Sequence, residues 1–360
     1  MSKKVIAAID LGSHALRMKI GEINKSGKFN ELESIRKIAV LGHDTFTKGK
    51  LSFETVDKVC DLLTLFKNSM EDYGVEHYEA MATSAIREAA NSDYIIDQIK
   101  LKTDIDIKVI SNSEEQFLTH KAIKKNLENY STLVEEGAVI VVVGAGSIQI
   151  TTYKNGKIRS SQNVKMGALR IREAFQELDG NILNFNRIMD EYITTNLEGV
   201  DFFSDTCEYE HLIAVGGEIN VISKMIEQKF GEDREVLSKK KFNKLFKQVE
   251  QMTIEEIEDV YDVKYERAKI LLPSMMLFQQ FLLKVNNSEI IVPHISLSDG
   301  IIQSIHENLN NTKMSTENIN DMIANARVIG AKFNYNRTHC ETVERKALYL
   351  FDLMKKIHGM

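Results

Sequence analysis

Three short glycine-containing segments in this chain each follow an apolar run. They are Asp10-Leu-Gly-Ser13, Gly144-Ala-Gly-Ser147 and Gly216-Gly217. Glycine lets the backbone approach an anion closely, so the N–H groups of such loops can hold a phosphate. Asp10 adds a carboxylate, a ligand type that Mg²⁺ prefers. Taken singly, each segment is explained about as well by a tight structural turn.

The segments next to these loops show what must hold them in place. Residues 5–9 and 138–143 are strand-like before the first two loops, and a strand pattern resumes after each loop. The third loop separates a strand pattern at 211–215 from a helical pattern that begins near Asn220, so an anion there would meet a helix N-terminus. The two halves share one plan, which is typical of the actin-like fold.

We therefore predict an α/β protein with two actin-like (ribonuclease H-like) lobes and an interlobe cleft. A chain of 360 residues is too long for one ordinary core. A polar, turn-rich stretch at 128–137 marks the boundary, so the first lobe is expected over 1–130 and the second over 131–305. Residues 306–360 are expected to form a C-terminal helical segment. Function must still be derived from the site, because this fold serves many chemistries.

One segment gives a more specific signal than the loops. The sequence from Ala82 to Asn91, ATSAIREAAN, resembles the signature of the Ppx/GppA family of exopolyphosphatases and guanosine pentaphosphate phosphohydrolases. Further family-like pieces occur in the expected order, including Asp10 to Arg17, Val109 to Glu115 and Met166 to Arg170. The likeness covers residues 5–305. Beyond it, residues 339–353 resemble the start of the helical C-terminal domain of longer members, here truncated.

The resemblance implies hydrolysis of a terminal phosphoanhydride, in polyphosphate or guanosine pentaphosphate, by metal-assisted attack of water. It implies that Glu115 is the general base and that Asp10 contributes to a Mg²⁺ site. The residues that it assigns to phosphate binding are Gly12, Ser13, Arg17, Ser84, Arg87, Gly144, Ala145, Gly146, Ser147, Gly216 and Gly217. Two of these roles have structural alternatives. Glu115 could complement a helix dipole, and Arg87 could form a structural ion pair.

The second loop departs from the family pattern, which has Asp-x-Gly-Gly-Gly-Ser-Thr-Glu. Val142, Ile148 and Gln149 stand where the aspartate, threonine and glutamate are expected. Valine cannot ligate a cation, so Asp10 is the only acid left in these loops. Two functions follow from this departure: an active hydrolase, or a catalytically weakened regulatory protein that binds polyphosphate or a guanosine alarmone.

Composition limits the other possibilities. The net charge of −6 argues against specific nucleic-acid binding, which favours a basic surface. We find no apolar run of the roughly 18 residues that a membrane span needs, and we expect a cytoplasmic protein with no membrane partner. The three cysteines are widely spaced and predict neither a disulfide framework nor a zinc site. The family resemblance leaves a homodimer and binding of guanosine tetra- or pentaphosphate as expectations.

Overall fold

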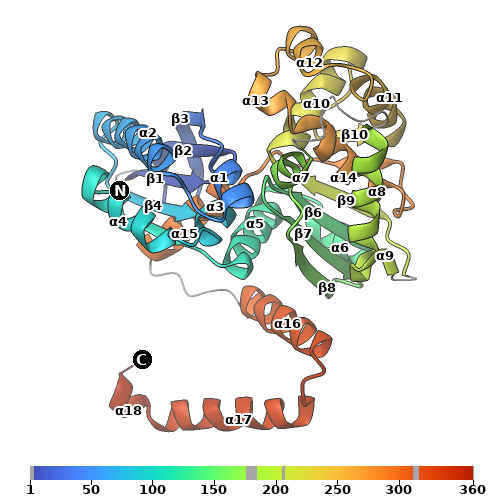
Figure 1. The fold of residues 1–360 in the computed structure, drawn as a ribbon. Helices are drawn as coiled ribbons and strands as arrows, with labels where there is room; N and C mark the ends of the chain where they lie inside the picture. The colour runs from blue at the N-terminus through green and yellow to red at the C-terminus, as the bar shows by residue number, and fades with distance from the viewer. Residues whose placement is uncertain (1–3, 176–184, 205–206, 311–315, 360) are drawn as a thin grey trace.

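The computed structural model describes residues 4–175, 185–204, 207–310 and 316–359. It has two lobes, each built around one mixed β-sheet with helices packed on it (Figure 1). Among these residues no helix is both long enough and apolar enough to cross a bilayer. The predicted α/β class with two actin-like lobes is confirmed.

The first sheet has the strand order β3-β2-β1-β4-β5. Strands β1 to β3 form an antiparallel meander, and β4 and β5 continue the sheet in parallel with β1. Their bounds are β1 Lys4–Leu11, β2 Ala15–Ile23, β3 Phe29–Ile38, β4 His77–Ala82 and β5 Ile107–Val109. The helices that follow them in this part of the chain are α1 Leu41–Lys48, α2 Phe53–Asp72, α3 Ser84–Arg87, α4 Ser92–Thr103, α5 Asn112–Asn126 and α6 Tyr130–Glu136.

The second sheet has the order β10-β11-β9-β6-β7-β8 and repeats the plan of the first. Strands β6 to β8 form the meander, and β9 and β11 extend it in parallel. The strands are β6 Ala138–Val143, β7 Ile148–Lys154, β8 Lys157–Val164, β9 His211–Val215, β10 Val236–Ser238 and β11 Glu289–Ile291. The helices are α7 Ala168–Ala174, α8 Phe185–Glu198, α9 Asp201–Ser204, α10 Gly217–Phe230, α11 Lys239–Val249, α12 Ile254–Tyr261, α13 Tyr265–Ala268 and α14 Leu271–Leu282.

Helix α15 (Leu297–Leu309) corrects the predicted division of the chain. Residues up to 305 were assigned to the second lobe, but α15 packs on the first lobe, against β1 and α5 (Figure 1). Its buried Ile301 and Ile305 join a cluster with Ile6 and Ala8 of β1. Residues 6 and 8 point to the same face of that strand, so α15 covers apolar surface that would otherwise meet water.

The described residues after α15 are mostly helical, as expected for a C-terminal helical segment, although residues 306–309 of the predicted segment belong to α15. Helix α16 (Thr316–Lys332) packs on β8, whereas α17 (Arg337–Leu353) has no buried residue and stands away from both lobes (Figure 1). A short helix, α18 (Lys355–His358), follows.

Candidate functional site

The loops between the lobes enclose a cavity of about 370 Å³. The loops that contribute to it include those from β1 to β2, from β6 to β7, and from β9 to α10. Every residue that the sequence assigned to the site lines this cavity except Arg87. The duplicated plan explains the convergence, because equivalent loops of the two lobes face each other.

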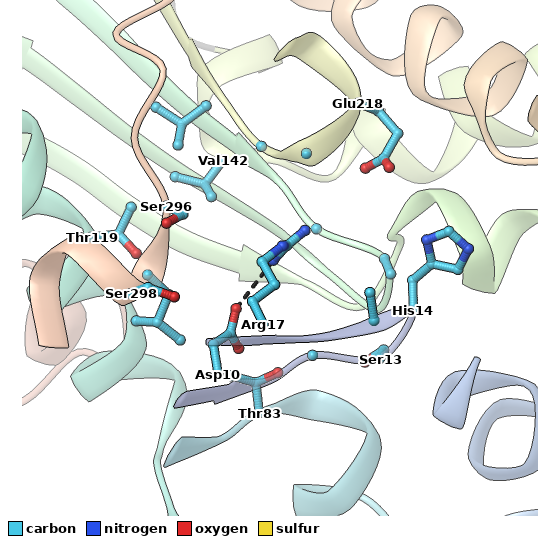
Figure 2. A pocket seen from close by; sticks show the side chains of 18 of the residues that line it. Asp10, Ser13, His14, Arg17, Thr83, Thr119, Val142, Glu218, Ser296 and Ser298 are labelled. Carbon is cyan, nitrogen blue, oxygen red and sulfur yellow. Dashed lines mark hydrogen bonds and ion pairs between the residues drawn. The ribbon is translucent and has the colours of Figure 1, made fainter. Parts of the chain in front are cut away.

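The first loop joins β1 to β2 and is closed by a hydrogen bond from Gly12 N to Ala15 O (3.1 Å). Asp10 and Arg17 lie opposite each other in the register of these strands, so their side chains meet in an ion pair at 3.1 Å (Figure 2). Burial raises the pKa of Asp10, and the charge of Arg17 partly opposes that rise. The hydroxyls of Ser13 and Ser84 are 2.8 Å apart, which joins this loop to the start of α3.

Glu115 lies in the first turn of α5, which Ser111 and Glu114 cap by a reciprocal pair of hydrogen bonds. Burial raises the pKa of Glu115; Arg87, 3.1 Å away, lowers it, and the charge of Asp10 raises it further. A raised pKa makes a carboxylate a stronger base, which suits a group that accepts a proton from water. Arg87 also donates to Ile110 O (2.7 Å), so this arginine fixes the position of Glu115.

The second loop joins β6 to β7 and is held from both lobes. Gly144 N donates to Ser147 O (2.9 Å), and Gly146 lies so close to Ser84 that an added Cβ would stand 2.4 Å from that hydroxyl oxygen. Arg170 of α7 donates to Gly146 O (2.8 Å) and to both carboxylate oxygens of Glu88 in the first lobe (3.1 and 3.0 Å). The loop therefore sits at the point where the two lobes touch.

The third loop begins at Gly216, whose φ of 145° is one that only glycine adopts readily. An added Cβ there would stand 2.4 Å from Val143 O. The turn brings the N-terminus of α10 to the cavity. Glu218 in that first turn is buried and pairs with Arg267, whose Nε lies 3.4 Å from Glu218 Oε1.

Several lining residues were missed from the sequence. They include His14, Lys19, Arg36, Thr83, Thr119, Arg267, His294, Ser296 and Ser298. Arg36 could have been found, because β2 and β3 pair Arg17 with Arg36, and directly paired residues share a face of the sheet. Arg267 lies in α13 and reaches the cavity only through tertiary packing, so no local sequence pattern predicts its position there.

Asp10 carries the carboxylate that could ligate a metal beside the first two loops, since Glu115 is held by Arg87. No group of three or more histidine, cysteine or acidic side chains that could hold a metal occurs within the described ranges. Mg²⁺ commonly binds through one or two carboxylates together with substrate phosphates and water. Asp10 fits that mode of binding, and Val142 adds no ligand (Figure 2).

The comparisons with known proteins agree with this geometry. The model of the Ppx/GppA phosphatase family matches residues 22–309. The chain belongs to this family. That membership confirms the resemblance carried by residues 82–91, and it accounts for the two actin-like lobes.

The individual relatives are distant in sequence. The bifunctional 3-dehydroquinate synthase/phosphatase of Fusobacterium nucleatum subsp. nucleatum is 25% identical over 207 residues, which cover 55% of this chain and 31% of that protein. The guanosine-5'-triphosphate,3'-diphosphate pyrophosphatase of Vibrio atlanticus is 23% identical over 261 residues, or 72% and 50% of the two chains. The chain thus spans from about a third to half the length of these curated relatives.

A solved structure shows the same fold. The crystal structure of an exopolyphosphatase from Cytophaga hutchinsonii superposes with a TM-score of 0.76 at 23% identity. The match covers 85% of this chain and 98% of that one.

Proposed function

We propose that this chain is a phosphohydrolase that releases terminal phosphate from inorganic polyphosphate or guanosine pentaphosphate. One observation carries the proposal: Glu115, a carboxyl whose pKa burial raises, lines the same cavity as the loops at Gly12 and Gly144. Family membership and the two substrates that relatives' names print support it. We further propose a cytoplasmic location, as expected from the sequence.

In the proposed reaction, the terminal phosphate lies against the loops at residues 12–13 and 144–147. Their N–H groups and the guanidinium of Arg17 would neutralise its charge, which is the main requirement of phosphoryl transfer. Water attacks the terminal phosphorus as the bond to the bridging oxygen breaks. Glu115 accepts the proton of that water, and the shortened chain leaves with the bonding electrons. Mg²⁺ held by Asp10 and the phosphates would supply further positive charge.

Val142 favours a second candidate, a weakened regulatory protein that binds the same phosphates without turning them over. It lines the cavity where the family pattern has an aspartate, and a valine side chain cannot hold a metal or its water. Glu115, retained in the cavity, favours the hydrolase.

Phosphate release distinguishes the two candidates. The assay uses long-chain polyphosphate and guanosine pentaphosphate with Mg²⁺ and compares the parent with Glu115→Gln. A general base contributes about 10² to 10⁴ in rate, so a hydrolase should lose at least a hundredfold in the variant. The control is Glu255→Gln, which removes an exposed carboxylate from α12 and should change nothing. A parent that binds both phosphates but releases none would refute the hydrolase.

A further inference from the structure

One side of the cavity carries polar groups that the proposed reaction does not use. His14 and Glu218 face each other there, apart from Thr119, Ser296 and Ser298 on the opposite side (Figure 2). Arg36 and Arg267 line the same cavity. We call His14, Arg36, Glu218 and Arg267 the outer cluster. Its members come from both lobes: from the first loop, β3, α10 and α13.

The outer cluster is buried but incompletely satisfied. His14 and Glu218 are each only 5% exposed. Within the described part of the chain, His14 Nε2 and Arg36 Nε have no hydrogen-bond partner, and Glu218 Oε1 and Arg267 Nε meet only each other, in the 3.4 Å ion pair and without a hydrogen bond. Such groups are uncommon in folded proteins, and each costs about 1 to 3 kcal/mol when left unpaired. A ligand that supplies their partners would recover that free energy.

The chemistry of the outer cluster restricts what that ligand can be. Arg36 and Arg267 donate hydrogen bonds, so phosphate oxygens suit them. Glu218 only accepts, and it carries the same charge as a phosphate. Inorganic polyphosphate at neutral pH offers acceptors and negative charge along its whole length, so it supplies no hydrogen-bond donor to Glu218 and is repelled by the charge of that carboxylate.

A nucleoside can supply hydrogen-bond donors to Glu218 without adding negative charge beside it. Ribose hydroxyls and base N–H groups are neutral donors to a buried carboxylate. The ring of His14 fits a neutral partner as well, because burial lowers its pKa to about 4 and leaves it uncharged at neutral pH.

We propose that Glu218 is a specificity-determining residue: with its outer-cluster neighbours it binds the nucleoside of a nucleoside polyphosphate and selects this class against inorganic polyphosphate. This choice between substrates rests on the hydrolase function proposed above. In the proposed arrangement the phosphate chain lies toward Asp10, and the nucleoside, which carries the hydrogen-bond donors, lies toward Glu218.

Binding tests the proposal without requiring turnover. Isothermal titration in Mg²⁺ buffer compares GTP, ATP and inorganic tripolyphosphate, which carries the same number of phosphates but no nucleoside. All proteins carry Glu115→Gln, so that no ligand is consumed. Glu218→Gln keeps the shape of the side chain, Glu218→Ala removes it, and Glu255→Gln is the matched surface control.

We expect GTP to bind more tightly than tripolyphosphate to the Glu115→Gln protein. Loss of a charged acceptor should weaken GTP by about 10- to 100-fold in Glu218→Ala, and tripolyphosphate should bind as well as before or better. Glu218→Gln should shift both affinities in the same directions by less, and it serves alone if Glu218→Ala does not fold. A Glu218 effect on GTP but not on ATP assigns the contact to the base; an equal effect on both assigns it to the ribose.

Equal affinity for GTP and tripolyphosphate, or equal weakening of both in Glu218→Gln, would overturn the proposal. Its failure is distinguishable from failure of the hydrolase function. If the protein binds GTP selectively but releases no phosphate, the proposed role of the outer cluster is supported and the hydrolase function is refuted. If the protein turns over polyphosphate and Glu218→Gln does not alter that turnover, the hydrolase function stands and the proposed role of Glu218 is refuted.

Discussion

Arg170 makes the contact between the lobes that is most open to a quantitative test. Its guanidinium donates to Gly146 O and to the carboxylate of Glu88, and it stacks over the ring of Phe46 at 3.9 Å from the centroid. Phe46 and Glu88 belong to the first lobe, whereas Arg170 and Gly146 belong to the second. Arg170→Ala therefore removes one interlobe attachment and one support of the second phosphate loop.

The expected loss of unfolding free energy depends on which contacts of Glu88 and Gly146 remain after Arg170 is replaced by alanine. Hydrogen bonds to charged groups contribute about 1.5 to 3 kcal/mol each, and a partly exposed cation–π contact about 0.5 to 1 kcal/mol. The full sum overstates the loss, since Lys165 lies 3.1 Å from Glu88 and keeps it paired. We expect the free energy of unfolding to fall by about 2 kcal/mol, roughly thirtyfold in the unfolding equilibrium.

Urea denaturation followed by circular dichroism measures this difference. Lys165→Ala is the matched control: its side chain is 66% exposed, so its ion pair with Glu88 should contribute less than about 1 kcal/mol. Phosphate release by Arg170→Ala should also fall, by about tenfold, because a loosened loop positions the phosphate less well. Arg170→Ala with the parent's urea midpoint and activity would refute the reasoning that this contact holds the lobes and the loop.

Three further predictions concern titration and the altered loop. Burial raises the pKa of Glu115 above its ordinary 4.5, and a base acts only when deprotonated, so a pH–rate profile should show activity falling on acidification at a pH above 4.5. Val142→Asp should tighten Mg²⁺ binding in the presence of polyphosphate, measured by titration calorimetry, and should destabilise the fold by about 1 kcal/mol or more because the site is partly buried; unchanged Mg²⁺ affinity would count against a metal next to position 142. Burial lowers the pKa of His120 from 6.5 to about 4, so the unfolded chain takes up a proton that the folded chain does not, and stability drops as pH falls from about 6.5 to about 4. His120→Gln should show a smaller drop between urea titrations at pH 7 and pH 4.5 than the parent, whereas an equal drop would mean that His120 is not held neutral.

The two-lobed fold and the loops of the cavity could be predicted because both depend on local sequence. β-branched runs that stop at glycine, as at Val143 and Gly144, define a strand and its turn within a few residues. Repetition of that order in both halves then indicates a duplicated plan. Residues 82–91 added the family, which spacing alone does not supply.

The remaining features depend on tertiary packing. The apolar stripe of α15, with Ile301 and Ile305, could pack on either lobe. It packs on the first lobe because one face of β1 there would otherwise be uncovered. Arg267 is close to Glu218 because α13 packs near the start of α10, some 50 residues earlier in the chain. A phosphate role for Arg87 was expected from the family; its contact with Glu115 depends on how α3 and α5 meet.

The return of α15 to the first lobe sets the order in which this protein can fold during synthesis. Ile6 and Ala8 leave the ribosome well before the helix that covers them, which ends at Leu309. At about 5 to 20 residues per second, their apolar face waits roughly 15 to 60 seconds for its cover. The first lobe thus begins to fold before the second lobe is synthesised but is completed only after it, and during that interval one face of its sheet is a surface that a chaperone can bind.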